Sequence, residues 1–366
     1  MTNVLLLGAG TIGRMIAKLL VESGDYRVRV GDTDAEGLRR LGQRLGVETQ
    51  VVDASSPEQL ASAAQGQQVV VSALTFRLNP RVARAAQAAG ASYFDLTEDV
   101  ETTAAVRSIA SDAGADQIFM PQCGLAPGFV GIVANHLAQR FDVLDSLLLR
   151  VGALPEFPTN SLKYNLTWST DGLINEYCNP CDVIHQSRRQ LVWPLEGLEH
   201  LSIDGVEYEA FATSGGLGTL CETYQDRVHE LNYKTVRYKG HRDRMLFLLD
   251  ELKLRDRREL LKEILENALP RTLQDVVIVF CTATGMRAGE RVQLWDARKI
   301  YHRQQGDEIW SAIQITTASC LCAVVDLHVH GQLPPRGFVR QEQVDLDLFL
   351  TNRFGRVFEA RSASAG

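Results

Sequence analysis

The first 120 residues alternate short apolar runs with longer amphipathic segments. The apolar runs have the length and composition of buried strands, and they lie at 4–7, 28–30, 49–52, 69–73, 92–95 and 117–120. Apolar residues recur at helical spacing over 14–22, 35–45, 57–64, 80–89 and 100–113. Strands that alternate with helices in this way predict an α/β domain of the Rossmann type, a doubly wound parallel sheet with helices on both faces.

The pattern changes near residue 124. A helix is expected over 130–140, and after it come longer strands rich in tyrosine, threonine and polar residues. These strands are expected over 144–151, 164–169, 201–203, 207–212, 233–238, 276–284 and 291–303, with a long charged helix over 242–268. Such strands are typical of antiparallel sheets, so a second α+β domain with a largely antiparallel sheet is predicted.

A helix rich in alanine, threonine and serine is expected over 311–329. The Gly-Gln-Leu-Pro-Pro sequence that follows marks its end. A helix at this point can return the chain to the first domain. We therefore expect an NAD-binding Rossmann domain over 1–124, completed by about 311–366, and a substrate-binding and dimerisation domain over 125–310.

The composition is that of a soluble globular protein, with 45% hydrophobic and 23% charged residues. No run of about 18 apolar residues that could cross a bilayer is expected, and the first apolar run lacks the basic region of a secretion signal. The expected location is therefore cytoplasmic. The net charge of −7 comes without a basic stripe, so neither nucleic acid nor a membrane is an expected partner.

Seven cysteines at irregular spacing argue against a disulfide framework. Cys178 and Cys181 form a C-x-x-C pair, but the sequence has neither a second such pair nor histidines at ligand spacing. Free thiols and no metal are therefore expected.

A glycine-rich turn, Gly8-Ala9-Gly10-Thr11-Ile12-Gly13, follows the first strand and opens the first helix. In this context Gly8 allows a tight turn, Gly10 lets the backbone approach a pyrophosphate, and Gly13 allows close helix packing. The N–H groups at the helix start favour phosphate. The alternative is a plain glycine-rich turn without a ligand.

Asp32 ends the second strand, 19 residues after Gly13, where a carboxylate can bind the adenosine ribose hydroxyls. Because it would repel a 2′-phosphate, NAD is favoured, with NADP as the alternative. The ends of the third and fourth strands complete the candidate cofactor-binding set, which is Gly8, Gly10, Thr11, Ile12, Gly13, Asp32, Asp53, Ala73 and Leu74.

Further motifs follow in a fixed order: YFDLTED at 93–99, CGLAPG at 123–128, YxxxWSxxGLxxEY at 164–177, TSGG at 213–216 and KTxRYxGH at 234–241. With the glycine turn, this order and spacing resembles the saccharopine dehydrogenase superfamily, most closely its L-lysine 6-dehydrogenase (lysine ε-dehydrogenase) branch. The resemblance runs nearly from end to end. The chain departs from the branch at Cys123, at Trp168 and at Gln341-Glu342.

The resemblance implies NAD-dependent oxidative deamination of the ε-amine of lysine, with release of aminoadipate semialdehyde, which cyclises to piperideine-6-carboxylate. The alternatives with the same imine chemistry are a saccharopine dehydrogenase or reductase and a carboxy(nor)spermidine dehydrogenase. The alternative of another class is a non-catalytic NAD-binding sensor, because a fold does not fix a function. The family tendency also implies a homodimer, which we expect through the second-domain sheet.

Amine oxidation needs a group that takes the ammonium proton. Asp95 and Glu98 follow the fifth strand, where neighbouring carboxylates can raise one pKa toward neutrality. Cys123 falls at the end of the sixth strand, and His241 can transfer a proton or support another residue. The alternatives are an acidic loop or helix cap for the carboxylates, Asp99 included, and a buried apolar role for Cys123.

The resemblance also supplies the candidate substrate-binding residues. Arg237 suits an α-carboxylate, because a guanidinium binds a carboxylate by two parallel hydrogen bonds. Tyr164, Trp168 and Tyr177 are expected to line the aliphatic chain, although ordinary core packing is the alternative for each. Glu176, Thr213 and Ser214 are expected at the α-amino group and the carboxylate.

Overall fold

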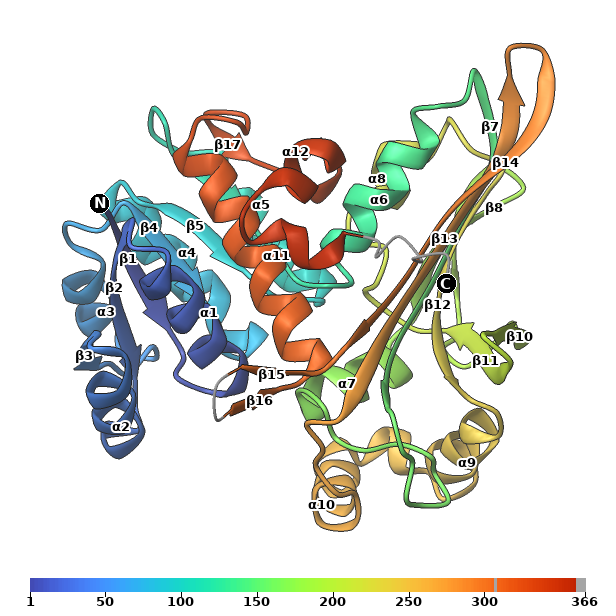
Figure 1. Cartoon of the computed structure of the whole chain (residues 1–366), viewed down its shortest axis with the longest axis horizontal. Coiled ribbons are helices and arrows are strands. Elements are labelled where there is room, and N and C mark those ends of the chain that lie inside the picture. Colours follow the sequence, from blue (N-terminus) through green and yellow to red (C-terminus); the bar gives the residue numbers. More distant parts are fainter. Residues whose placement is uncertain (306–307, 360–366) are drawn as a thin grey trace. The chain divides into compact units, whose positions relative to one another are not determined.

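The computed structural model describes residues 1–305 and 308–359 (Figure 1). These residues divide into two compact units, one formed by 1–132 with 316–359 and the other by 133–315. The end of the expected first domain, 360–366, lies outside the described residues.

The first unit contains a seven-stranded parallel sheet in the order β17-β6-β5-β4-β1-β2-β3. The strand order reverses between β1 and β4, which is where Rossmann sheets bind nucleotides. The strands are β1 Thr2–Leu7, β2 Tyr26–Asp32, β3 Glu48–Val51, β4 Val69–Ser72, β5 Ser92–Asp95, β6 Ile118–Met120 and β17 Gly337–Phe338. The predicted doubly wound sheet is confirmed.

Helices alternate with these strands as the sequence predicts: α1 Thr11–Glu22, α2 Ala35–Leu45, α3 Pro57–Ala64, α4 Asn79–Ala89 and α5 Val100–Ala110. Asp34, Ser56 and Asp99 cap α2, α3 and α5 by accepting backbone N–H groups of the first turn. The helix-cap alternative for Asp99 is therefore confirmed.

Helix α11, Ala312–Val329, corrects one expectation. It has 18 residues and a mean hydropathy of 1.5, so by length and composition it is long and apolar enough to cross a membrane. Its apolar character was missed because alanine, threonine and cysteine replace the large aliphatic residues of an obvious span. Since 83% of the helix is buried inside the fold, its environment is that of a core helix. The short helix α12, Leu346–Thr351, follows it.

The second unit is built on an eight-stranded sheet in which β12 and β7 are parallel and the other pairs are antiparallel. The predicted, largely antiparallel sheet is confirmed. The strands are β7 Val143–Pro155, β8 Cys181–His185, β9 Arg188–Val192, β10 Glu199–Ile203, β11 Val206–Ala212, β12 Glu230–Tyr238, β13 Asp275–Arg287 and β14 Glu290–Tyr301, and β15 Arg303–Gln305 pairs separately with β16 Glu308–Trp310.

Two predicted elements of this unit are wrong. Residues 164–169 form a loop with one isolated bridge, from Leu166 to Arg271, instead of a strand. The long helix over 242–268 is broken, because Lys253 takes a left-handed conformation with φ of 54°. The pieces are α9 His241–Leu246, a π-turn Phe247–Glu251, a 3-10 turn Leu254–Asp256 and α10 Arg258–Ala268. The remaining helices are α6 Phe129–Ala138, α7 Thr170–Cys178 and α8 Leu220–Tyr224.

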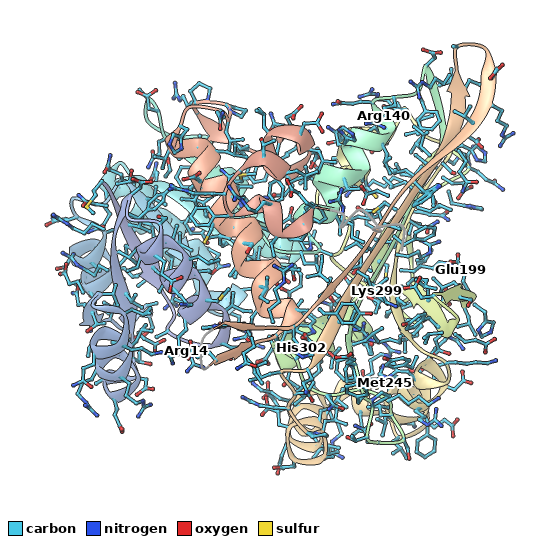
Figure 2. The ribbon with its side chains drawn as sticks, viewed as in Figure 1. Arg14, Arg140, Glu199, Met245, Lys299 and His302 are labelled. Atoms are coloured by element: carbon cyan, nitrogen blue, oxygen red, sulfur yellow. The ribbon has the colours of Figure 1, made fainter. Side chains whose placement is uncertain are left out.

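The two faces of the second sheet differ. Because side chains alternate along a strand, Thr235 and Arg237 of β12 project to one face and Lys234 to the other. The first face is covered by α7, α9 and α10, whose apolar residues pack with Phe211 of β11 in one core. On the opposite face Glu199, labelled in Figure 2, accepts hydrogen bonds from Arg150 and Lys234. Arg237 therefore projects to the face that α7, α9 and α10 cover, and not to the face of Glu199.

Candidate functional site

The turn between β1 and α1 needs glycine at two positions. Gly8 has φ of 105°, and a Cβ there would lie 2.7 Å from the carbonyl oxygen of Ala73. A Cβ on Gly13 would lie 1.9 Å from the carbonyl oxygen of Gly8. The turn, the helix and the end of β4 thus approach so closely that no side chain fits between them. Leu74 follows Ala73 there, and both are half-buried.

Gly10 leaves open space instead. A Cβ at Gly10 would meet nothing within 4 Å, and no side chain caps the start of α1. Thr11 is exposed and Ile12 half-buried in the first turn of that helix. An open helix N-terminus favours anions through its N–H groups and its dipole. The turn therefore fits the pyrophosphate of a dinucleotide.

Asp32 links this turn to the end of β2. Its carboxylate accepts the N–H of Ala9 at 2.6 Å and the N–H of Asp34 at 3.0 Å. Asp53 lies beyond the end of the adjacent β3, exposed, and a hydrogen bond from Ser55 lowers its pKa. The structure thus places both predicted carboxylates at the carboxyl ends of neighbouring strands, where such sheets bind the adenosine half of the cofactor.

Asp95 is fully buried at the end of β5. Its carboxylate accepts hydrogen bonds from the Tyr93 hydroxyl at 2.7 Å and from the N–H groups of Thr97 and Gln122 at 2.9 and 3.1 Å. Burial raises the pKa of Asp95 to about 6. Because every described contact of this carboxylate is internal, the structure favours a role in positioning the two loops over the predicted proton transfer. Glu98 lies half-buried in the same loop.

Cys123 is joined to Asp95 through the backbone, since its N–H donates to the Asp95 carbonyl at 2.8 Å. The thiol is fully buried and donates to the carbonyl of Met120 at 3.0 Å. The side-chain amide of Gln341 donates to the sulfur at 3.2 Å. Burial raises the pKa of Cys123 well above its ordinary value. The thiol therefore stays neutral, which argues against the predicted catalytic role and favours the buried alternative.

Arg237 is the centre of a polar cluster in the second unit. It is 3% exposed, and its Nε donates to the hydroxyl of Tyr177 at 2.9 Å. Its guanidinium carbon lies 5.1 Å from the centre of the Tyr164 ring. Within residues 1–305 and 308–359, no carboxylate forms an ion pair with Arg237. Among the described residues, Glu176 is the carboxylate whose charge acts on this guanidinium, and it does so without an ion pair to Arg237. A buried guanidinium without a directly bound carboxylate is a candidate anion site.

His241 completes the contacts of Tyr177. Its Nδ1 lies 2.8 Å from the carbonyl oxygen of Leu162, so Nδ1 carries the proton, and Nε2 accepts the Tyr177 hydroxyl at 3.1 Å. Burial lowers the pKa of His241 to about 3, and the charge of Arg237 adds to this effect. Both nitrogens of a neutral imidazole are thus engaged. Of the two predicted roles, these contacts favour support of another residue over proton transfer.

The Tyr164 hydroxyl lies buried near the guanidinium. Tyr164 is 1% exposed, and its hydroxyl makes no hydrogen bond of good geometry within the described part of the chain, although the side chains of Thr167 and Trp168 are near enough to oppose the rise of its pKa. Buried hydroxyls are normally paired. An oxygen-bearing group of a ligand next to Arg237 would satisfy Tyr164.

The other predicted substrate residues surround this cluster. Ser214 donates its N–H to the carbonyl of Glu176 at 3.0 Å, and its hydroxyl donates to the carbonyl of Pro180. The hydroxyl of Thr213 lies 2.8 Å from that of Thr235, two residues before Arg237. Trp168 packs half-buried on the shared core. The structure therefore gathers these candidates in one unit, although Ser214 is held by backbone contacts.

Sequence reasoning did not identify two supporting residues, Tyr233 and Glu209. A Cβ on Gly216 would lie 2.4 Å from the ring of Tyr233, so the glycine lets that tyrosine pack under the loop. Glu209 accepts the N–H groups of Gly240 and Arg242 at 2.8 and 2.6 Å and so fixes the start of α9. The pattern of alternate residues along β11 and β12 is the signal that could have found Tyr233 and Glu209, because both share the face of Arg237.

Cys178 and Cys181 are both buried and free. Among the residues that the structure describes, histidine, cysteine, aspartate and glutamate form no group of three that could hold a metal ion.

Two family models match the chain: the saccharopine dehydrogenase NADP binding domain over residues 4–118 and the saccharopine dehydrogenase C-terminal domain over residues 124–354. The mitochondrial alpha-aminoadipic semialdehyde synthase of Bos taurus is 23% identical over 253 residues, and that of Rattus norvegicus 22% over 259. Each match covers 65% of this chain and 27% of the relative, so the chain spans about a quarter of the length of these proteins.

Among solved structures, the apo saccharopine dehydrogenase (L-Glu forming) of Saccharomyces cerevisiae is similar with a TM-score of 0.77. The identity is 15%, and the match covers 98% of this chain and 96% of that one. At this identity the likeness establishes the fold of both units.

Proposed function

Since this chain belongs to the saccharopine dehydrogenase family, we propose that it oxidises the ε-amine of L-lysine to an imine by hydride transfer to NAD. Water then hydrolyses the imine to aminoadipate semialdehyde and ammonia. The observation that carries the proposal is the buried guanidinium of Arg237, whose hydrogen bonds within the described residues go to the Tyr177 hydroxyl and the Val236 carbonyl. The carboxylate of an amino acid can bind its remaining donors.

The cluster around Arg237 is preorganised for that carboxylate. Tyr177 and the Val236 carbonyl hold Nε and Nη1 at 2.9 Å each, which orients the remaining donors of the guanidinium. A guanidinium fixed in this way binds a carboxylate by two parallel hydrogen bonds. The Tyr164 hydroxyl can add a third, and the tyrosine rings can cover the aliphatic chain.

The glycine turn and Asp32 support the choice of NAD. The nicotinamide cofactor, when bound, supplies the acceptor for a hydride from the carbon that carries the amine. Gly8, Gly10 and Gly13 would admit its pyrophosphate, and Asp32 would accept hydrogen bonds from the ribose and repel a 2′-phosphate. The family model is described by NADP binding, so the NAD preference rests on Asp32.

A proton acceptor must act before the hydride leaves, because only a neutral amine is oxidised. Asp95, Cys123 and His241 are buried, and their described polar contacts are internal. Glu98 is half-buried. We therefore assign proton acceptance to Glu98, the partly exposed member of the four predicted residues.

Saccharopine is the second candidate substrate, because both family models and the similar solved structure are described as saccharopine dehydrogenases. Saccharopine carries additional carboxylates, and each needs a cation. In the second unit Arg150 is also buried, but Glu199 already binds it through two hydrogen bonds. Among the described residues of this unit, Arg237 is thus the buried guanidinium without an ion pair, which favours a substrate with one carboxylate.

The test measures formation of reduced nicotinamide with purified protein and L-lysine, saccharopine or cadaverine, each with NAD and with NADP. Cadaverine is lysine without its carboxylate, so it isolates the contribution of Arg237. We expect kcat/KM for lysine to exceed that for cadaverine by about 30-fold or more, and Arg237→Ala to abolish this difference, because a charge-assisted bidentate contact contributes about 2–3 kcal/mol.

The alternatives give other results. Turnover of saccharopine but not of lysine assigns the chain to the second candidate. Tight NAD binding without turnover of any amine assigns it to the sensor class.

A further inference from the structure

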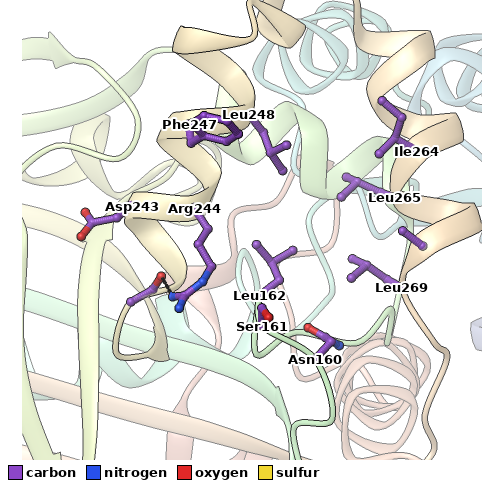
Figure 3. A pocket seen from close by; sticks show the side chains of 12 residues that line it. Asn160, Ser161, Leu162, Asp243, Arg244, Phe247, Leu248, Ile264, Leu265 and Leu269 are labelled. Atoms are coloured by element: carbon purple, nitrogen blue, oxygen red, sulfur yellow. Dashed lines mark hydrogen bonds between the residues drawn. The ribbon is translucent and has the colours of Figure 1, made fainter.

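A pocket of 840 Å³ opens in the second unit between the loop at 160–162, the α9 segment and α10 (Figure 3). Its volume lies within the range of about 300–1,000 Å³ that is typical of small-molecule sites. The lining is largely apolar and includes Leu162, Phe247, Leu248, Ile264, Leu265 and Leu269. None of the candidate substrate residues described above belongs to this lining, so the pocket is distinct from the candidate substrate site.

The polar part of the pocket is a cation held against the backbone. Arg244 lines the pocket, and its Nη1 donates to the carbonyl of Gly240, as the dashed line in Figure 3 shows. Gly240 has φ of 91°, and a Cβ there would lie 2.6 Å from Nη1. The glycine therefore lets the guanidinium rest on the chain. Asp243 also lines the pocket, but its carboxylate pairs with Arg242 at 3.3 Å.

We propose that this pocket binds a small amphipathic carboxylate, with its apolar chain among the leucines and its carboxylate on Arg244. The hydrophobic effect favours this occupant, because Phe247 and Ile264 are 48% and 37% exposed in the free chain. Charge selects the head group, since a guanidinium held by one hydrogen bond keeps further donors for a carboxylate. The site is a binding site without chemistry of its own.

Two segments that line the pocket also hold His241 in place: the loop at Leu162 and the residue Gly240 that precedes His241. Leu162 gives its side chain to the pocket and its carbonyl to Nδ1 of His241 at 2.8 Å. Gly240, which carries the Arg244 contact, directly precedes His241. A ligand that shifts either segment moves His241 and, through Tyr177, the guanidinium of Arg237. Occupancy is therefore expected to change KM for the amino acid, a consequence that rests on the proposed function.

The binding test needs no activity. Calorimetry measures decanoate binding to the full chain, to Ala268→Trp, which fills the pocket, and to Arg244→Gln, which removes the cation. Ala268 lines the pocket and is exposed, so the larger side chain enters the pocket without disturbing the core. The matched controls are Asn267→Trp on the same helix and Arg188→Gln on β9, both exposed and outside the lining.

We expect Ala268→Trp to weaken decanoate binding by about tenfold or more and Arg244→Gln by about threefold, because an exposed charge pair contributes little. Both controls should bind decanoate like the unaltered chain. Lack of decanoate binding at millimolar concentration, or binding that Ala268→Trp leaves unchanged, overturns the site. Equal binding of decylamine overturns the choice of a carboxylate, and a KM that decanoate does not alter overturns the coupling to His241.

Discussion

The hydroxyl of Tyr177 lies 3.1 Å from Nε2 of His241 and receives the Nε–H of Arg237 at 2.9 Å. Because that nitrogen of Arg237 can only donate, the hydroxyl gives its own proton to His241, and the Leu162 carbonyl fixes the other end of the imidazole. The direction of each hydrogen bond in this series, from Arg237 through Tyr177 and His241 to Leu162, is therefore determined. A backbone carbonyl thus orients a buried guanidinium through two side chains.

Tyr177→Phe interrupts this series of hydrogen bonds and leaves Arg237 Nε and His241 Nε2 unpaired in a buried site. An unsatisfied buried polar group costs about 1–3 kcal/mol, so we expect KM for lysine to rise at least about tenfold. KM for cadaverine should change little, because that substrate does not need Arg237. Steady-state kinetics with both amines measures the difference.

The matched control is Tyr238→Phe, one residue after Arg237. Its hydroxyl donates to the Pro155 carbonyl at 2.9 Å, and as the next residue of the strand it projects to the opposite face of the sheet. This variant loses a hydroxyl hydrogen bond but should keep the unaltered KM for lysine. An equal rise of KM in both variants would contradict the assigned role of Tyr177.

The first unit could be predicted from sequence because its signals are local. Apolar runs, helical spacing and the caps Asp34, Ser56 and Asp99 each act within a few residues. The loop at 164–169 was mistaken for a strand because its aromatic and β-branched residues have the composition of one. Its conformation depends instead on Asn160, whose side chain donates to the Tyr164 carbonyl at 2.7 Å. Composition does not reveal such a contact.

The candidate residues at the second site could be named from motifs, but their chemical states could not. His241 is neutral because burial and the charge of Arg237 lower its pKa to about 3. The carbonyl of Leu162, 79 residues earlier, accepts a hydrogen bond from Nδ1 and so fixes the position of that proton. The carboxylate of Asp95 accepts the N–H of Gln122, 27 residues later, and this internal contact disfavours a role in proton transfer. These contacts are long-range, so the role of each side chain depends on the tertiary structure.

Gly10→Ala and Gly13→Ala should have different effects, although both lie in the same turn. A Cβ at Gly13 would collide with the Gly8 carbonyl, so we expect a loss of about 1–3 kcal/mol in the free energy of unfolding. A Cβ at Gly10 meets only open space, and that variant should lose less than about 1 kcal/mol. NAD affinity of Gly10→Ala should nevertheless fall at least about tenfold.

Thermal unfolding and fluorescence titration with NAD measure these two quantities. If Gly10→Ala binds NAD as tightly as the unaltered chain, the pyrophosphate does not lie on this turn.

Asp32→Asn tests the cofactor preference. The amide oxygen of asparagine can still accept the Ala9 N–H, which holds the turn, although the Asp34 N–H then loses its acceptor. The charge that repels a 2′-phosphate is also lost. We expect the ratio of kcat/KM with NAD to that with NADP to fall by about tenfold, which corresponds to about 1.4 kcal/mol. An unchanged ratio, measured at saturating lysine, would show that Asp32 does not face the adenosine ribose.

Asp95 should give the first unit a pH-dependent stability. Burial raises its pKa from the ordinary value of 3.8 to about 6, so the folded state holds a proton that the unfolded chain releases. The contribution of Asp95 to the free energy of unfolding is therefore full below pH 3.8 and is lost as the pH rises toward 6. Asp95→Asn can keep the bonds to Thr97 and Gln122 through its amide oxygen while removing the titration.

Denaturant unfolding of both proteins between these two pH values measures the effect. We expect the stability of the unaltered chain relative to Asp95→Asn to decrease as the pH rises through this window and to be constant above it. Asp275, in the second unit, also has a pKa raised to about 6 by burial, but both proteins retain it, so its contribution cancels in the difference. A difference that does not vary with pH would mean that Asp95 ionises in the folded chain as readily as in the unfolded one.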